Sequence, residues 1–297
     1  MKKVMIILAV IGVGLALFAA GLFLYVRNML SKPVLYNVPG MEEVAVNKNQ
    51  VYKTLPDREL CFDLYSPKNA VAGHGLPAVI LVHGAGPEFM IENAKDWKCF
   101  ETYGQLLAAS GLKAVAFNHR GNISFANIRQ EAQDVDDLIA HIRTESGRLG
   151  IDPRKLCLFV FSAGGPCISN VLQAKPDYLS CLVAYYAVLD LAVLPHSFIR
   201  GMSPQDLEDF SPVMQLRNHP EKLPPLLVVK AGKDMTREIP AGMDHFVAEA
   251  RAQGVPVTYL VHEQGKHGFD MLNDDAKTKA IIAETIRFIQ MHTAGER

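Results

Sequence analysis

The sequence has few cysteines and almost no net charge. Its 297 residues include 5 cysteines, and the formal net charge is -1 at pH 7. No cysteines form a Cys-x-x-Cys pair or a zinc-like Cys/His spacing, so the sequence predicts no metal site. Because clusters of basic residues are also absent, nucleic acid is not an expected partner. Without a repeat or a second domain, the 49% hydrophobic chain fits one large α/β domain with an appendage.

The cysteines stand mostly in apolar surroundings. Cys157 and Cys181 lie in apolar runs that are typical of buried strands, and Cys167 lies in a predicted helix. We expect these three thiols to act as small buried hydrophobic groups. Cys61 and Cys99 could pair, but nothing in the sequence requires a disulfide between them.

The appendage is a long uncharged apolar run from Val4 to Val26, which lies between Lys2-Lys3 and Arg27. At about 1.5 Å per residue, a helix of this length spans roughly 35 Å, enough to cross a hydrocarbon core of about 30 Å. A cleaved signal peptide is the alternative, because Ala19-Ala20-Gly21 could serve as its cleavage site. Its apolar region should be shorter, however, at roughly 7–15 residues. We therefore predict an uncleaved transmembrane anchor over residues 1–27.

The charges around this run predict its orientation. Lys2, Lys3 and the amino terminus slightly outweigh Arg27 and Lys32, so the amino end is expected in the cytoplasm and the domain outside. The expected localisation is thus a single-pass membrane protein with an extracytoplasmic domain. If the run is a cleaved signal, the protein is secreted instead.

Residues 28–42 contain Pro33 and Pro39 without clear periodicity, and are predicted to tether the anchor to a domain over residues 43–297. Within the domain, two short strand-like runs come first, and buried strands then alternate with helices. This order is typical of a mostly parallel sheet with helices on both faces. A proline-punctuated segment over residues 190–224 interrupts the alternation and is predicted to form a lid or substrate wall.

An apolar strand that ends abruptly at a serine organises this domain. Residues 156–161 read as a buried strand, and Ser162-Ala163-Gly164-Gly165 follows at once before a predicted helix. On such a bend the hydroxyl projects above the sheet edge, and the next amide points to where an oxyanion would form. The usual Gly-x-Ser-x-Gly pattern is imperfect, because Val160 replaces the first glycine. Alternatively, the serine only caps the helix.

An acid and a base stand just after two later strands. Asp234 follows the strand 226–230, and His267 follows the strand 257–261. The site of an open parallel sheet lies beyond the carboxyl ends of its strands, so both side chains can converge on Ser162. His267 would take the serine proton and return it to the leaving group. Asp234 would fix the imidazole tautomer and stabilise the imidazolium.

Two backbone amides are needed to hold the oxyanion of such a reaction. The predicted donors are Ala163, directly after the serine, and Ala85, in the loop after the strand 78–82. Each such donor contributes roughly 2.7–4 kcal/mol.

Other polar residues compete for these roles. Asp190 also ends a strand and is a rival acid, whereas His262 ends its strand and is less suited to be the base. His83 is predicted to be a structural hydrogen-bonding group. His119 and Arg120 are predicted to organise the turn after their strand, although Arg120 could instead contact substrate.

The motifs together resemble the α/β-hydrolase superfamily, and most closely its dienelactone hydrolase-like and related serine esterases. They are His83-Gly84-Ala85-Gly86, Asn118-His119-Arg120-Gly121, Phe161-Ser162-Ala163-Gly164-Gly165, Gly232-Lys233-Asp234 and His267-Gly268-Phe269, within residues 43–292. The resemblance implies an eight-stranded, mostly parallel sheet and the catalytic roles assigned above, without cofactor or metal. Three features depart from the family: Val160, Asn118 where aspartate is common, and a serine where dienelactone hydrolase has a nucleophilic cysteine. The dienelactone substrate is therefore not expected.

The sequence predicts a carboxylic ester hydrolase that forms an acyl-enzyme. Apolar residues within 190–224 suggest an ester with an apolar group: Leu191, Val193, Leu194, Phe198, Ile199 and Met202. A peptidase or an acyltransferase would use the same triad with another acceptor. A non-catalytic binding protein on the same fold is a further alternative, but eroded triad positions would then be expected.

Overall fold

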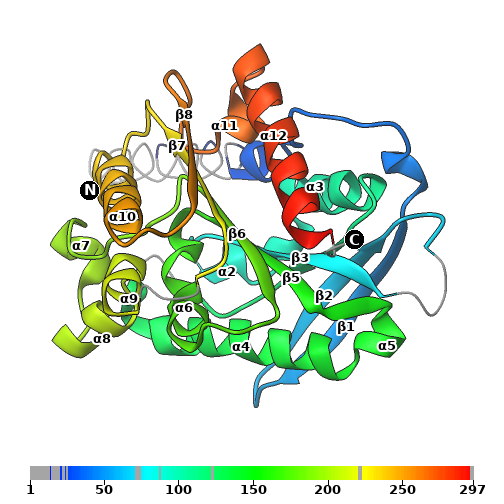
Figure 1. Cartoon of the computed structure of the whole chain (residues 1–297), viewed down its shortest axis with the longest axis horizontal. Coiled ribbons are helices and arrows are strands. Elements are labelled where there is room, and N and C mark those ends of the chain that lie inside the picture. The colour runs from blue at the N-terminus through cyan, green and yellow to red at the C-terminus, as the bar shows by residue number, and fades with distance from the viewer. Residues whose placement is uncertain are drawn as a thin grey trace, which may run out of the picture.

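The computed structural model describes residues 14, 21, 24, 26–70, 75–86, 88–121, 124–219 and 223–294. An eight-stranded sheet forms its centre, in the order β1-β2-β4-β3-β5-β6-β7-β8 (Figure 1). The strands are β1 (Ala45–Thr54), β2 (Glu59–Ser66), β3 (Leu76–Val82), β4 (Lys113–Phe117), β5 (Ile151–Phe161), β6 (Leu179–Tyr185), β7 (Leu226–Ala231) and β8 (Val257–His262).

The sheet is mixed, with its antiparallel part confined to one edge. β1 pairs with β2 and β2 with β4 in antiparallel orientation, whereas the pairs from β4 through β3, β5, β6 and β7 to β8 are parallel. The prediction of a mostly parallel eight-stranded sheet is therefore confirmed. Because β5, β7 and β8 run in the same direction, their carboxyl ends lie at one edge of the sheet.

Helices cover both faces of the sheet. Those that pack on the sheet include α3 (Lys98–Ala109), α4 (Ile128–Thr144), α6 (Ser169–Ala174), α9 (Pro212–Asn218), α10 (Glu238–Ala252) and α12 (Ala276–Thr293). Shorter elements are η1 (Met41–Glu43), α2 (Glu88–Ile91), η2 (Ala94–Asp96), η3 (Phe125–Asn127), α5 (Ser146–Leu149), η4 (Ser162–Gly164), η5 (Pro166–Ile168), α7 (His196–Ile199), α8 (Pro204–Asp209) and α11 (Phe269–Leu272). Side chains of α3 and α12 pack in one core layer, and those of α4, α6, α9 and α10 pack in the other.

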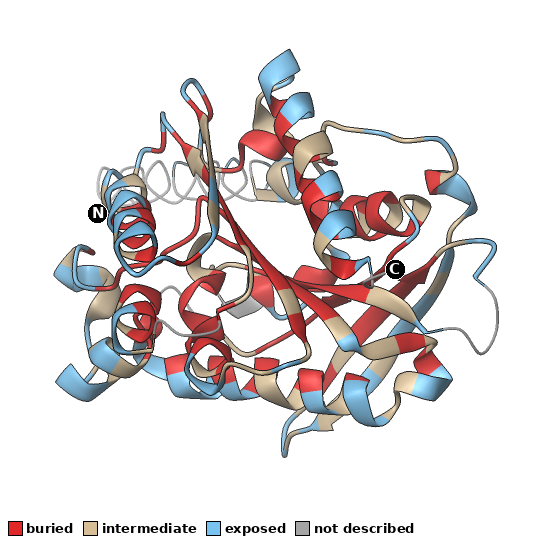
Figure 2. Ribbon diagram, viewed as in Figure 1, coloured by how far each residue is buried: buried red, intermediate tan, exposed pale blue. Residues whose placement is uncertain are grey.

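The central strands are buried on both faces. Along β3, Ala78, Ile80 and Val82 belong to one core layer, while Val79 and Leu81 belong to the other. This alternation follows from the two-residue period of a strand, and burial of both faces explains the continuous apolar run in the sequence. Figure 2 shows the buried residues concentrated in the central strands, while the edge strand β1 is largely exposed or half-buried.

Most of the predicted anchor over residues 1–27 lies outside the described residues. In the part of the chain that the structure describes, no helix has the length and apolar character needed to cross a membrane. The segment expected to be a tether, residues 28–42, lies against the domain. Val34 is 2% exposed within one core layer, and the Leu35 N–H donates to the Asp270 carbonyl at 2.8 Å. The structure thus places this segment on the surface of the domain.

The proline-punctuated segment 190–224 contains α7, α8 and α9. Leu191, Val213 and Leu216 are buried in the core layer of α4 and α10, so much of the segment is structural. Leu194 and Phe198 also line a cavity at Ser162, and the role of the segment as a lid or substrate wall stays a prediction.

All five cysteines are free thiols. The disulfide left open for Cys61 and Cys99 is therefore not formed. Cys157, Cys167 and Cys181 are fully buried, as expected for small hydrophobic groups.

Candidate active site

Ser162 occupies a sharp turn at the carboxyl end of β5. It is the first residue of η4 and has a φ of 53°, in the left-handed region that residues with a side chain rarely adopt. The Val188 N–H donates to the Ser162 carbonyl at 2.8 Å and ties the turn to the chain after β6. A non-glycine residue held in this region stores strain, which is typical of functional sites. The predicted strand–serine–helix turn is present in the structure.

Close backbone contacts explain the small residues after the serine. A Cβ on Gly164 would lie 2.7 Å from the carbonyl oxygens of Val82 and His83. A Cβ on Gly165 would lie 2.0 Å from the Val188 carbonyl oxygen. Val160, two residues before the serine, is fully buried in the core and pairs with Ala184 of β6. The strand therefore accepts valine where the usual pattern has glycine.

A chain of two short hydrogen bonds joins the predicted triad. His267 Nε2 lies 2.8 Å from Ser162 Oγ, and His267 Nδ1 lies 2.6 Å from Asp234 Oδ2. Both distances fall in the range that proton transfer requires. The Asp234 side chain is 1% exposed, and its other oxygen accepts the Thr236 N–H at 3.0 Å. The structure thus assembles the three side chains in the order that was predicted from the sequence, and their catalytic roles remain predictions.

The loop after β3 lies directly against the serine turn. A Cβ on Gly84 would lie 2.8 Å from the Ser162 Cβ and 3.3 Å from the Ala163 nitrogen. Ala85 and Ala163 both line the cavity that contains Ser162 and His267. The two predicted oxyanion donors therefore come from segments that meet at the nucleophile.

A hydrogen-bonded group of one buried carboxylate and two tyrosines lies beside the His267 imidazole. The sequence did not predict a role for any of the three. The Tyr186 ring lies 4.7 Å from the His267 ring, and its hydroxyl donates to Asp270 Oδ1 at 2.8 Å. Tyr103 donates to the other oxygen of Asp270, also at 2.8 Å. Burial raises the pKa of Asp270, although the two hydroxyls and the nearby His267 oppose that shift. The only signal in the sequence is an aspartate three residues after the candidate base.

The rival acid and base have other partners. Asp190 Oδ2 lies 2.6 Å from Nδ1 of His245, on α10. His262 Nε2 lies 3.0 Å from the Thr278 hydroxyl and 3.2 Å from an Asp275 oxygen. Neither residue replaces Asp234 or His267 in the chain that ends at Ser162.

His83 and His119 form a buried stack under the loop after β3. Their ring centroids are 3.7 Å apart, with an angle of 10° between the planes. Burial lowers the pKa of both imidazoles, and the closeness of His119 lowers that of His83 further. His83 Nδ1 lies 2.8 Å from the Gly84 carbonyl and His119 Nδ1 lies 2.7 Å from the Arg120 carbonyl. Both neutral rings therefore have a structural role, as was predicted for His83 and His119.

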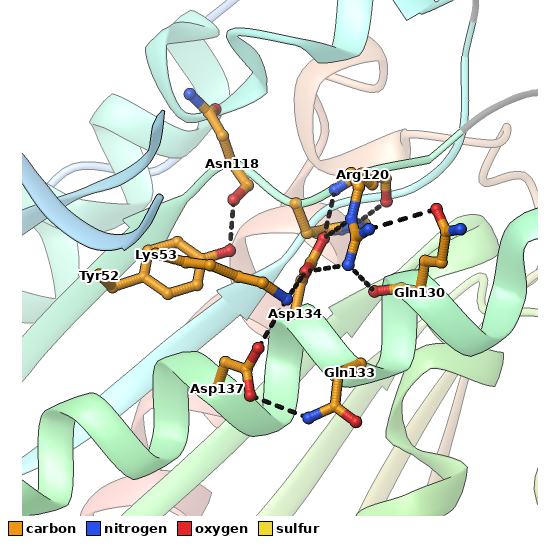
Figure 3. Close-up of polar contacts among 9 residues, drawn as sticks. Tyr52, Lys53, Asn118, Arg120, Gln130, Gln133, Asp134 and Asp137 are labelled. Carbon is orange, nitrogen blue, oxygen red and sulfur yellow. Dashed lines mark hydrogen bonds and ion pairs between the residues drawn. The ribbon is translucent and has the colours of Figure 1, made fainter. Parts of the chain in front are cut away.

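Arg120 holds the turn after β4 to α4 (Figure 3). Its guanidinium and backbone N–H donate to Asp134, at distances from 2.7 to 2.9 Å. Lys53 donates to the same carboxylate at 2.6 Å. Burial alone would raise the pKa of Asp134, but the bonds from Arg120 and Lys53 outweigh it and lower this pKa. Arg120 thus organises the turn, and its charge is committed to α4 rather than to a substrate.

One group of potential metal ligands exists among the described residues. Atoms of His119, Glu131 and Cys167 lie within 4.8 Å of one another, and all three residues are buried. The Cys167 thiol donates to Glu131 at 3.7 Å, and both ring nitrogens of His119 contact backbone carbonyls. Burial, followed by the charge of Glu131, raises the pKa of the thiol. The thiol and one ring nitrogen of the neutral His119 are thus engaged in hydrogen bonds within the fold.

Among the described residues, two apolar cavities reach Ser162. One has a volume of about 270 Å³ and lies toward Phe198 and Ile239, while the other has a volume of about 200 Å³ and lies toward Trp97. Ala85, Ser162 and His267 line both cavities. The serine therefore stands between two spaces, each suited to an apolar group of a substrate.

Several known proteins are similar to this chain in sequence or in structure. Dipeptidyl-peptidase 4 of Giardia intestinalis is 26% identical over 148 residues, which are 46% of this chain and 19% of that protein. This chain thus matches only a small part of that relative's length. A thermostable esterase from Pseudomonas putida has a TM-score of 0.67 at 17% identity, over 92% of this chain and 89% of that one. Thermogutta terrifontis esterase 2 phosphorylated by paraoxon has a TM-score of 0.65 at 21% identity, over 86% and 97%.

These likenesses establish the α/β-hydrolase fold. The narrower resemblance to dienelactone hydrolase-like esterases is not supported by them and stays an expectation. The model of the prolyl oligopeptidase family matches residues 100–296, a stretch that contains the serine turn, Asp234 and His267. Since that match covers more than half of the sequence and every member of the hydrogen-bonded triad, this chain belongs to the prolyl oligopeptidase family.

Proposed function

We propose that the protein is a serine hydrolase that cleaves carboxylic esters through an acyl-enzyme. The observation that carries this proposal is the continuous hydrogen-bond chain from Ser162 through His267 to the buried Asp234. A serine hydroxyl is too weakly acidic to attack a carbonyl unaided, and this chain supplies the missing base.

The reaction follows from the geometry. His267 Nε2 takes the hydroxyl proton while Ser162 Oγ attacks the ester carbonyl carbon. The amides of Ala85 and Ala163 hold the tetrahedral oxyanion, and Asp234 stabilises the imidazolium. His267 then gives its proton to the departing alcohol, which leaves an acyl-serine. A water molecule then attacks the acyl carbonyl carbon while His267 takes its proton. The acid leaves, and the proton passes from His267 to Ser162 Oγ, which restores the serine.

The lining of the two cavities favours an ester over a peptide with a free amino terminus. Among the described lining residues the carboxylates are Asp234 and Asp270. Asp234 is hydrogen-bonded to His267, and both oxygens of Asp270 accept hydrogen bonds from tyrosine hydroxyls. Neither carboxylate is left to bind an ammonium group. The known structures of similar fold also include esterases, one of them modified by the organophosphate paraoxon.

A peptidase is the second candidate, favoured by membership of the prolyl oligopeptidase family and the likeness to a dipeptidyl-peptidase. An acyltransferase would share the acyl-enzyme and differ only in the acceptor. A comparison of ester, peptide and alcohol acceptors on one preparation separates these activities, because all three start from the same acylated serine.

The first experiment is labelling with a fluorophosphonate probe, using wild type and Ser162→Ala. We expect rapid labelling of the wild type and none of the variant. Ser169→Ala, on α6, is the matched control and should label like wild type. A folded wild type that does not react would contradict the proposal and leave a non-catalytic binding protein as the better reading.

We also propose that residues 1–27 anchor the protein in a membrane, with the catalytic domain outside the cytoplasm. The uncharged run from Val4 to Val26 supports this proposal. Amino-terminal sequencing of the mature protein tests retention of the anchor, and protease protection tests its orientation. A mature chain that begins after residue 21 would mean that the run is a cleaved signal.

A further inference from the structure

The N-terminal segment forms one wall of the candidate active site. The cavity of about 200 Å³ is lined by Met29 together with Trp97, Met271 and Ser162. Met29 lies in the helical stretch 26–30, within the segment that was expected to be only a tether. The three apolar side chains of this wall are partly exposed rather than buried. They are therefore available to contact a ligand beside the serine.

A second hollow, a groove, lies along the same segment. It has a volume of about 530 Å³, and Val26, Leu30, Met90 and Trp97 contribute apolar side chains to it. Trp97 lines both hollows, so the groove and the cavity adjoin at its indole ring. The indole N–H donates to the Met90 carbonyl at 3.0 Å, which fixes the ring between them. One apolar hollow thus lies along the N-terminal segment and another at Ser162, and the two share Trp97.

The sequence indicates what surrounds the N-terminal end of the groove. Val26 is the last residue of the uncharged run that begins at Val4, and Met29 follows three residues later. In a helix that separation is about 4.5 Å along the axis. If the run lies in a bilayer, the groove opens at the membrane surface.

We propose that the groove and the cavity receive the apolar chain of an ester dissolved in the lipid bilayer. The substrate then reaches Ser162 along the N-terminal segment without passing through water. An apolar chain that moves from lipid into an apolar groove avoids the unfavourable exposure to water that transfer through solution would require. This inference rests on the proposed ester hydrolase function and on the proposed anchor.

The test compares delivery of one ester by two routes. Full-length protein is reconstituted in phosphatidylcholine vesicles, and 4-methylumbelliferyl oleate is placed either in the same vesicles or in separate protein-free vesicles. We expect hydrolysis to be at least tenfold faster when enzyme and ester share a vesicle. Equal rates by the two routes would overturn the proposal.

Charged substitutions in the wall test the proposed route itself. The measured quantity is the ratio of oleate to acetate ester turnover, with 4-methylumbelliferyl acetate supplied in water. Met29→Glu should lower this ratio at least tenfold, and Met271→Glu provides a second variant in the lining of the same cavity. Met291→Glu, at a 67% exposed position on α12 outside both hollows, is the matched control and should keep the wild-type ratio. Wild-type ratios in both wall variants would overturn the proposal.

Failure of this inference is distinguishable from failure of the proposed function. Fluorophosphonate labelling and acetate ester hydrolysis report on the triad alone. A wild type that labels and hydrolyses the acetate, but gains nothing from sharing a vesicle with the oleate, disproves only the membrane route. A wild type that neither labels nor hydrolyses disproves the ester hydrolase itself.

Discussion

Two aspartates in this protein hold a histidine in the same way, yet only one pair leads to a nucleophile. Asp234 Oδ2 lies 2.6 Å from His267 Nδ1, and Asp190 Oδ2 lies 2.6 Å from His245 Nδ1. In each pair the second carboxylate oxygen accepts the backbone N–H two residues further along, at 3.0 and 2.9 Å. Both carboxylates are almost fully buried. Judged by the acid and the first ring nitrogen alone, the two pairs are equivalent.

The pairs differ in what the second ring nitrogen meets. His267 Nε2 faces the Ser162 hydroxyl at 2.8 Å, whereas His245 Nε2 faces the Arg217 guanidinium at 3.3 Å. A serine hydroxyl can give up its proton and attack, but a guanidinium keeps its protons and is no nucleophile. An aspartate–histidine pair is therefore not by itself a sign of catalysis. The group that faces the second ring nitrogen determines whether the pair can activate a nucleophile.

Substitution of the acid that serves Ser162 should have the largest effect. Asp234→Asn should lower kcat about 10,000-fold, because an amide no longer fixes the productive tautomer of His267. Steady-state hydrolysis of a soluble ester measures kcat, and circular dichroism checks that the variant is folded. Full activity in Asp234→Asn with loss of activity in Asp190→Asn would reverse the assignment of the two pairs.

A third buried aspartate sharpens the comparison, since Asp134 pairs with Arg120 and Lys53 instead of a histidine. Asp134→Asn should lower the free energy of unfolding by about 3 kcal/mol at pH 7, because Arg120 loses its carboxylate partner and Lys53 loses the more buried of its two. Asp137→Asn, which removes a more exposed partner of Lys53, should cost only about 0–1 kcal/mol.

The pH dependence of that effect has a defined sign. The folded protein holds the pKa of Asp134 below its ordinary value of about 3.9, since the bonds from Arg120 and Lys53 outweigh burial. The stabilisation is therefore fully present above pH ~4 and is lost as the pH falls through the lower folded pKa. Urea unfolding at pH 7 and pH 3 should show a smaller difference between wild type and Asp134→Asn at pH 3. An unchanged difference would contradict this account.

Substitution of the other acid should affect stability and spare catalysis. Asp190→Asn removes the charge that meets His245 and should lower the free energy of unfolding by about 2 kcal/mol. Turnover should stay within about twofold of wild type, because the Asp190 carboxylate contacts neither Ser162 nor His267. Thermal unfolding and ester kinetics on the same sample measure both quantities. A hundredfold loss of turnover in a folded sample would refute the separation of the two pairs.

The smallest expected effect concerns the tyrosine ring beside His267. Tyr186→Phe keeps the ring and removes the hydroxyl that fixes it to Asp270, and should raise the activation free energy by about 1 kcal/mol, a fivefold fall in kcat. Tyr103→Phe removes the other hydroxyl on Asp270 and is the matched control, with a smaller change in kcat expected. Equal kcat values in the two variants would remove Tyr186 from a positioning role.

The local pattern of the sequence was enough to predict the sheet and the triad. Apolar strands that alternate with helices predict a mostly parallel sheet, and the carboxyl ends of parallel strands meet at one edge. Ser162, Asp234 and His267 each follow such a strand, so their meeting could be foreseen without coordinates. The serine turn could be foreseen as well, because the small residues after it reflect close backbone contacts.

The partners of the remaining polar residues could not be read from the sequence. Asp190 and His245 are 55 residues apart, and Tyr103 and Asp270 are 167 residues apart. No periodicity links such pairs, since side-chain packing between separate elements brings them together. Residues 28–42 lacked a periodic pattern for the same reason, because single side chains such as Val34 dock on the domain.

The sequence by itself thus determined the fold class and the order of the catalytic candidates, because both depend on strand direction and on short motifs. Only the tertiary structure decided which of two equivalent aspartate–histidine pairs reaches the serine. It also decided that the N-terminal segment lines a cavity at that serine. The physical reason is that strand pattern is encoded locally, whereas the neighbour of a side chain is set by the packing of the whole chain.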